Sequence, residues 1–361
     1  MMVPYKIKRF LLGIFGILAG LLIAEGLARC LLPYPARQIA LLRTRAPDLQ
    51  MDAGTDLKNP GYNPFLQRRP FSEWICDGKS PERMNNEGFR DRDFIVAKSP
   101  DKIRLAVLGD SFTEGWMVDR MAAFPRVIES DLQPYVEVLN FGLANRSPLR
   151  YVALYREIVR KYHPDIVLVC LYCNDLGEDE ALRNYVIFDA AGVPVHFDYE
   201  RYFHHTPRMP QTKWEKRLDK WQWIFCQHSR LYPYLAAMLT VDSGFRKRIL
   251  ETPSPHSFPF LWKNTASYLF TLKEMLGKDG AKFLLAYVPD AGDFASPNQL
   301  YDGIQQFAAD MNIPFPPVKS FLTATDSKAL YLVGDGHFSP QGHSLYGHEL
   351  SAWLKTVLPR K

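Results

Sequence analysis

Ser111 stands in the turn-forming sequence Gly-Asp-Ser-Phe at residues 109–112, directly after a run of mostly apolar residues at 103–108. A serine in the turn between a buried strand and a helix is presented at the carboxyl edge of a sheet, with its backbone N–H toward a bound anion. Because Gly, Asp and Ser are ordinary turn residues, this motif alone is weak evidence for a nucleophile. It also differs from the Gly-x-Ser-x-Gly elbow, since Thr113 replaces the second glycine.

A glycine-rich loop near the carboxyl end of the chain contains residues that would complement such a serine. Asp335 and His337 lie there in the sequence Gly-Asp-Gly-His, followed by Phe-Ser-Pro-Gln-Gly-His. An alcohol is a weak nucleophile, so it needs a base of near-neutral pKa and a carboxylate that fixes the tautomer of that base. His337 can reach a serine at a strand end, and Asp335 can hold the imidazole.

Two further turns contain groups that could stabilise an oxyanion. Gly142 follows the apolar run at 136–140, and Asn174 follows the run at 166–170. A tetrahedral oxyanion needs two or three preorganised donors, which the N–H groups of Ser111 and Gly142 and the amide of Asn174 would supply. Each residue alone is better explained as an ordinary turn residue. Four such sites, in order and each at a strand end or loop, favour an active site.

With these residues in place, the chain resembles the SGNH/GDSL hydrolase family. The four blocks of that family occur here in order at Ser111, Gly142, Asn174 and His337. The resemblance covers about residues 103–175 and 262–361. The upstream sequence Asn-Asn-Glu-Gly-Phe-Arg-Asp at 85–91 is similar to a segment of membrane-anchored bacterial members.

The resemblance implies a three-layer α/β/α, flavodoxin-like core with a parallel sheet. It also implies Ser111 as nucleophile, His337 as general base and Asp335 as the acid that orients the base. The sequence departs from the family pattern at three places. Tyr172 and Asn145 stand where glycine is often found, and Asp335 precedes its histidine by two residues rather than three.

Strands and helices that alternate along the chain must position these residues. Such alternation predicts βαβ units and a parallel sheet, whose buried strands are nearly continuous apolar runs. The predicted strands are 103–108, 136–140, 166–170 and 283–288. The predicted helices are 123–132, 148–162, 262–276, 299–311 and 341–358.

Two segments do not fit this alternation. Residues 33–102 carry repeated turn signals and no strong period, so we expect an irregular wrapping segment there. Within the hydrolase domain at 103–361, residues 176–261 form an insertion, with a small hairpin near 185–195 and an aromatic-rich helical stretch at 214–239. An insertion after a strand's carboxyl end is equally consistent with a substrate-binding lid and with a surface decoration.

The amino-terminal residues predict a membrane anchor. Three basic residues precede the apolar stretch 10–32, which is long enough to span a bilayer as a helix. Glu25 and Arg29 interrupt it four residues apart, so they share a helix face and can pair. We expect residues 1–32 to be a signal anchor, with the catalytic domain outside the cytoplasm. A cleaved signal peptide is the alternative.

The composition excludes several other classes of protein. The 361 residues include 47% hydrophobic and 23% charged residues with a net charge of +5, which fits a packed globular protein rather than a disordered or nucleic-acid-binding one. Five cysteines do not make a disulfide scaffold, although a Cys76–Cys226 bridge is possible. We expect Cys170 and Cys173 to be buried inert thiols. The histidine spacings support no zinc site, and we expect no cofactor.

These inferences predict a serine ester hydrolase that acts through an acyl-enzyme, on an acylated glycan or a lipid of the cell envelope. An O-acetyltransferase that uses the same three residues is a close alternative, because the two activities differ only in the acceptor. A catalytically inactive, envelope-anchored binding module on the same fold is the alternative from another class.

Overall fold

The structure is a computed structural model of the whole chain. It divides into two compact units, one of residues 1–47, 206–252 and 333–335, and the other of residues 48–205, 253–332 and 336–361. The structure describes residues 5–31, 63, 65–74, 82–190, 192–198, 221, 225, 228–240, 258–290, 299–316, 327–332 and 335–358.

A parallel four-stranded sheet forms the centre of the larger unit, in the order β4-β3-β5-β8. Its strands are β3 (Ile103–Leu108), β4 (Val136–Asn140), β5 (Ile166–Leu171) and β8 (Lys282–Tyr287). Every residue of β3 and β5 is buried, as their apolar sequences predict. The chain runs from β3 outward to β4 and then returns to the other side of β3. This is the flavodoxin-like order, whose direction reverses between β3 and β5, and α/β folds of this kind bind ligands at the carboxyl ends of the strands at such a reversal.

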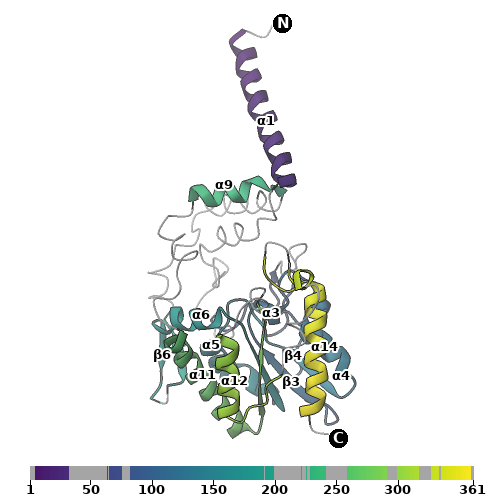
Figure 1. The fold of residues 1–361 in the computed structure, drawn as a ribbon, viewed down its shortest axis with the longest axis vertical. Helices are drawn as coiled ribbons and strands as arrows, with labels where there is room; N and C mark the ends of the chain where they lie inside the picture. Colours follow the sequence, from purple (N-terminus) through teal and green to yellow (C-terminus); the bar gives the residue numbers. More distant parts are fainter. Residues whose placement is uncertain are drawn as a thin grey trace. The chain divides into compact units, whose positions relative to one another are not determined.

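Helices cover the sheet in two groups, so the core has three layers (Figure 1). On one side α4 (Phe124–Leu132) packs against α14 (Pro340–Val357). On the other side α11 (Phe258–Asp279) packs against α5 (Pro148–Glu157), α6 (Asp175–Arg183) and α12 (Gln299–Asp310). Short helices η1 (Arg120–Ala122), η2 (Val159–Tyr162) and η3 (Ser327–Leu330) connect these elements. The α/β fold with a parallel sheet is therefore the one that the sequence predicts.

The predicted insertion at 176–261 differs from the structure at both of its ends. Helix α6 occupies its start and α11 begins at Phe258, and these two helices pack together against the core. The sequence signal of α6 is weak because a buried acid, Asp179, lies between the apolar Leu176 and Leu182. The expected hairpin is present as antiparallel β6 (Val186–Phe188) and β7 (Pro194–Phe197). Most of the helical stretch expected at 214–239 lies outside the described residues.

The described part of the wrapping segment contains little regular structure. Its only strands are the short antiparallel pair β1 (Glu73–Trp74) and β2 (Glu82–Arg83) among the residues described there. The side chain of Asn85 organises the turn that follows, accepting hydrogen bonds from the N–H groups of Glu87 and Phe89, both at 2.9 Å. This turn brings Arg90 and Asp91 into the protein interior, where both side chains are buried.

The smaller unit contains α1 (Tyr5–Leu31) and α9 (Leu231–Thr240). The expected pair is present, with Arg29 Nε 2.8 Å from Glu25 Oε1. The same carboxylate accepts hydrogen bonds from the N–H groups of Arg230 and Leu231, and so joins the end of α1 to the start of α9. Among the described residues we find no helix with the length and apolarity needed to cross a membrane. The anchor at residues 1–32 stays a prediction.

Candidate active site

Ser111 is the first residue of α3 (Ser111–Glu114), immediately after β3. The carboxylate of Asp110 caps this short helix by accepting a hydrogen bond from the N–H of Phe112 at 3.0 Å. Gly109 permits the sharp turn, since a Cβ there would lie 1.9 Å from Thr113 Oγ1. The N–H of Ser111 belongs to the first turn of α3, where N–H groups have no intrahelical acceptor.

His337 is held in a loop just before α14. Tyr331 and Phe338 form a β-bridge across this loop, and the N–H of Leu332 donates to the carbonyl of His337 at 2.7 Å. Ser339 then caps α14, accepting from the N–H of Gly342 at 3.1 Å. The backbone of the loop is therefore fixed on both sides of the imidazole.

Ser111 and His337 meet at the carboxyl edge of the sheet, although they are 226 positions apart in the chain. Ser111 Oγ lies 2.7 Å from His337 Nε2, within hydrogen-bond distance. The ring of Phe112 packs against the imidazole with centroids 4.8 Å apart, and Phe112 also contacts Phe338 at 4.8 Å. For Nε2 to accept the hydroxyl proton, the neutral imidazole must carry its own proton on Nδ1.

Asp335 is described by the structure and is half-buried. It falls in the smaller unit, with residues 333–335, whereas His337 falls in the larger one. Its role as the acid that orients His337 stays a prediction.

Gly142 lies directly on the backbone of α3. A Cβ at this position would be 2.4 Å from both the nitrogen of Glu114 and the carbonyl carbon of Thr113, so only glycine fits here. Its N–H donates to Oδ1 of Asn140 at 2.9 Å. The amide that the sequence predicts as an oxyanion donor is thus engaged within the chain in this structure.

Asn174 follows β5, one strand away from Ser111, at the start of α6. Its Nδ2 donates to Glu178 Oε1 at 3.0 Å. A side-chain amide nitrogen has two hydrogens, so this bond uses only one of them. Asn174 also faces the carboxyl of Asp110 closely enough to lower its pKa. The structure therefore places Asn174 beside the turn that contains Ser111.

Buried carboxyl groups gather behind this edge of the sheet. Burial raises the pKa of Asp110 to about 6, although His337 and hydrogen bonds from Phe112 and Asn174 act in the opposite direction. Burial also raises the pKa of Asp175 well above its usual range, and the neighbouring carboxylates of Asp110 and Glu178 add to the effect. Several carboxyl groups therefore lie buried close to the turn that contains Ser111, and their burial favours the neutral, protonated forms.

Sequence reasoning missed two buried carboxyl groups near Ser111, Asp175 and Glu114. Asp175 immediately follows Asn174, so its place after a buried strand was a usable signal. Its Oδ2 accepts a hydrogen bond from the N–H of Tyr172 at 3.1 Å and shapes the turn. Glu114 is fully buried at the end of α3, and nothing in the local sequence distinguishes it from an exposed helix residue.

Three further cysteine and histidine side chains that the structure describes bear on the sequence predictions. Cys170 is buried and its pKa is raised by burial, whereas Cys173 is exposed because it lies in the turn beyond β5, so the expectation of two buried thiols was wrong for Cys173. Cys76 and Cys226 lie outside the described residues. Burial lowers the pKa of His343 to about 3. In the described part of the chain, no three His, Cys, Asp or Glu side chains are grouped as metal ligands would be.

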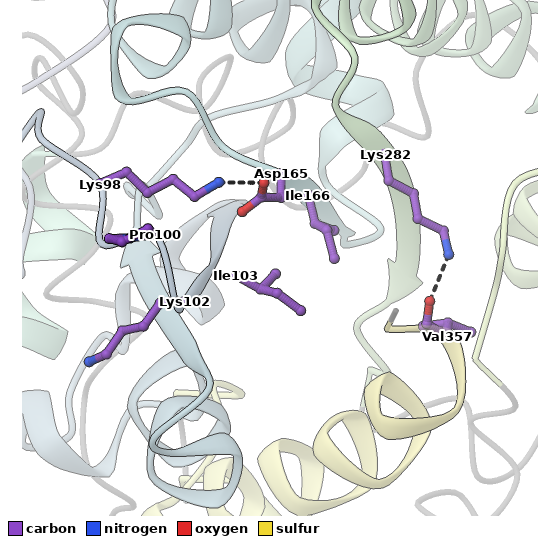
Figure 2. A pocket seen from close by; sticks show the side chains of 8 residues that line it. All are labelled: Lys98, Pro100, Lys102, Ile103, Asp165, Ile166, Lys282 and Val357. Carbon is purple, nitrogen blue, oxygen red and sulfur yellow. Dashed lines mark hydrogen bonds and ion pairs between the residues drawn. The ribbon is translucent and has the colours of Figure 1, made fainter. Parts of the chain in front are cut away.

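A pocket of about 430 Å³ lies at the opposite, amino edge of the sheet (Figure 2). Lys98 pairs there with Asp165, and Lys282 Nζ donates to the carbonyl of Val357 at 2.7 Å. Six residues of strand span about 20 Å, which separates this pocket from Ser111. The lining residues are Lys98, Pro100, Lys102, Ile103, Asp165, Ile166, Lys282 and Val357.

No protein-family model matches the chain, and no curated protein matches it. Among solved structures, it is similar to a lipase/acylhydrolase from Enterococcus faecalis, with 14% identity over 72% of this chain and 98% of that chain and a TM-score of 0.41. It is also similar to a catalytic mutant of an acetylxylan esterase from Geobacillus stearothermophilus, with 13% identity over 72% and 96% of the chains and a TM-score of 0.41. It is similar to TesA as well, with 12% identity over 71% of this chain and 99% of that chain and a TM-score of 0.40.

Proposed function

We propose that this chain is a serine ester hydrolase of the SGNH/GDSL type. Ser111 is the nucleophile, His337 the general base and Asp335 the acid that orients the imidazole. The observation that carries the proposal is the 2.7 Å distance between Ser111 Oγ and His337 Nε2. A serine hydroxyl becomes a useful nucleophile when a neutral base within hydrogen-bond distance accepts its proton.

The reaction proceeds in two acyl transfers. Ser111 Oγ attacks the acyl carbon while its proton moves to His337 Nε2, and the carbonyl oxygen becomes an oxyanion. The intermediate collapses, the ester C–O bond breaks, and Nε2 returns the proton to the departing alcohol. Water then attacks the acyl-enzyme, again losing a proton to Nε2, and releases the carboxylic acid and the free serine.

The oxyanion is stabilised by the N–H of Ser111 and by the amide of Asn174. The first is supported by its place at the start of α3, and the second by the position of Asn174 beside the turn that contains Ser111, where its amide would exchange its bond to Glu178 or to Asp110 for one to the oxyanion. Gly142 is the third proposed donor. Its N–H would have to exchange its bond to Asn140 for one to the oxyanion. This exchange is favourable because an N–H forms a stronger hydrogen bond with a charged oxygen than with a neutral amide oxygen.

The substrate is an ester on an acylated glycan or a lipid of the cell envelope, and the protein reaches it from a membrane anchor at residues 1–32. Support for the setting comes from the sequence, where basic residues precede the apolar stretch at 10–32.

The test is ester hydrolysis by the full-length chain purified in detergent, with p-nitrophenyl acetate as the substrate. We expect Ser111→Ala to lower kcat/KM by about 10³-fold or more, with the exposed-side-chain variant Ser267→Ala as the matched control. Equal, slow turnover by wild type and Ser111→Ala would instead support a binding module. Adding an acetyl donor and a glycan acceptor then distinguishes the two enzymes, since transfer that exceeds hydrolysis would identify an acetyltransferase.

A further inference from the structure

We propose that Glu114 is a positioning residue that fixes the Gly142 loop (residues 141–147) on the nucleophile helix α3, and that Arg68 of the wrapping segment is its required counter-ion. The inference deepens the proposed function and rests on it, because it concerns the geometry of the same site. It assigns a role in the reaction to a part of the chain that precedes the α/β core.

The two oxygens of the Glu114 carboxylate join different parts of the molecule. Oε1 forms an ion pair with Nη1 of Arg68, and Oε2 accepts a hydrogen bond from the N–H of Ala144 at 2.8 Å. Glu114 is the last residue of α3, which begins at Ser111, and Ala144 lies two residues after Gly142. The carboxylate therefore ties the Gly142 loop to the helix that presents the nucleophile.

The loop and the helix are already in direct contact, so small displacements of one are transmitted to the other. Asn140 Nδ2 donates to the carbonyl of Thr113 at 2.9 Å on one side of the contact. Gly142 leaves no space for a Cβ against the backbone of α3. Glu114 fixes the other side through Ala144, so the N–H of Gly142 is held between two anchored points.

The charge of Glu114 is tolerable only because cations face it. A buried carboxylate without a partner is strongly destabilising, whereas a hydrogen-bonded ion pair compensates its lost hydration. Although burial raises the pKa of Glu114, the guanidinium of Arg68, the N–H of Ala144 and the charge of Arg90 lower it below its usual value. Glu114 is therefore ionised at neutral pH, and both of its bonds are charge-assisted.

Both cations come from the wrapping segment, whose backbone holds them in place. Gly88 adopts a left-handed conformation with φ +79°, and a Cβ there would lie 1.8 Å from the carbonyl oxygen of Arg68. Arg90 in turn donates to the carbonyls of Gly115 and Val118, just beyond α3. The segment thus delivers two guanidinium groups to the rear of the nucleophile helix.

The experiment compares Arg68→Met, Glu114→Gln and the double variant in the full-length chain. For Arg68→Met we expect kcat for p-nitrophenyl acetate to fall about 10- to 100-fold with little change in KM, because a small displacement of catalytic groups affects the reaction more than binding. Its kcat should fall further as pH rises, since Glu114 ionises without Arg68. The double variant should regain kcat relative to Arg68→Met and lose this pH dependence. Arg83→Met, which removes an exposed pair with Asp93, is the matched control.

Hydrogen exchange of residues 141–147 gives a readout that does not depend on catalysis. We expect faster exchange in Arg68→Met and recovery in the double variant. If the variants show this exchange pattern but wild type shows no Ser111-dependent turnover, the proposed function fails, whereas the role of Glu114 in fixing the Gly142 loop stands.

Two results would overturn the positioning role: a double variant no more active than Arg68→Met, or an Arg68→Met protein with wild-type kcat, pH profile and exchange. Should Arg68→Met not fold, Glu114→Gln decides the question. Gln keeps an acceptor for Ala144 and frees a guanidinium that is already 10% exposed, so this variant should fold, but it replaces the charge-assisted bond to Ala144 by a weaker neutral one and should lower kcat. Unchanged kcat and exchange in Glu114→Gln would then count against the role.

Discussion

The two halves of the candidate site are held by different forces. The nucleophile half, around α3 and the Gly142 loop, is fixed by buried ion pairs and side-chain hydrogen bonds, among them Arg68–Glu114 and the 3.2 Å pair between Arg126 and Asp91. The histidine half is fixed by a backbone bridge and by packing of aromatic rings around Phe338. Removing a partner of a buried ion pair should therefore disturb the nucleophile half, whereas the histidine half should respond mainly to changes in packing.

The halves also differ in the buried groups that titrate. Behind Ser111 lie acids whose pKa values are raised, including Asp110, Asp175 and Asp179. Six residues beyond His337 lies His343, whose pKa is lowered. Burial disfavours the charged form in each case, so the nucleophile half is destabilised as pH rises and the histidine half as pH falls.

Gly142→Ala should give the largest effect on the nucleophile half. The new methyl group would lie 2.4 Å from backbone atoms of Thr113 and Glu114, which cannot move without displacing α3. We expect a loss of about 1–3 kcal/mol in the free energy of unfolding, with a clear loss of esterase activity. Chemical denaturation and initial rates measure the two effects.

Gly177→Ala is the matched control for that substitution. Gly177 lies inside α6 with nothing within 4 Å of an added Cβ, so alanine there should be neutral or stabilising by up to about 1 kcal/mol. A Gly142→Ala protein as stable and active as Gly177→Ala would show that the contact between the loop and α3 is looser than described.

His343→Gln tests the acid response of the histidine half. His343 accepts a hydrogen bond from the N–H of Phe124 at 3.3 Å through Nδ1, and glutamine keeps an acceptor without titrating. The folded-state pKa of about 3 lies below the usual value of 6.5, so the unfolded chain binds the proton first. Wild type should lose up to about 1.4 kcal/mol of stability per pH unit between pH 6.5 and 3, and the variant should lack this contribution.

The exposed His348→Gln provides the control for the acid response, because His348 pairs with Asp131 at the surface. Parallel stability curves for wild type and His343→Gln from pH 7 to pH 4 would be inconsistent with a neutral, buried His343.

Asp175→Asn tests whether the nucleophile half loses stability as pH rises, and we expect this to be the smallest of the three effects. The folded-state pKa of Asp175 is raised, so the native state keeps a proton that the unfolded chain loses above about pH 3.8. Wild-type stability should fall relative to the variant as pH rises, by less than about 1.4 kcal/mol per pH unit because Asp110 shares the effect. Thermal unfolding from pH 5 to pH 8 measures this difference, and a constant difference across that range would refute the assignment.

Local sequence predicted the strands and most helices well. The apolar runs at 103–108 and 136–140 coincide with β3 and β4, because burial on both faces leaves a continuous hydrophobic pattern. Helix α6 was missed since its inner face contains Asp179, which accepts hydrogen bonds from Thr265 Oγ1 and the N–H of Leu149. A buried polar residue with distant partners hides the helical period.

The sequence by itself determined the alternation of strands and helices, the order of the four motifs, and the positions of Ser111, Gly142, Asn174 and His337 at strand ends or loops. Only the tertiary structure decided that Ser111 and His337 come within hydrogen-bond distance, that the N–H of Gly142 bonds to Asn140, and that Arg68 faces Glu114. The physical reason is the separation along the chain over which each kind of interaction acts. Apolar periodicity and turn chemistry act over a few residues, whereas a buried charge finds its partner across 46 residues and the imidazole reaches its serine across 226.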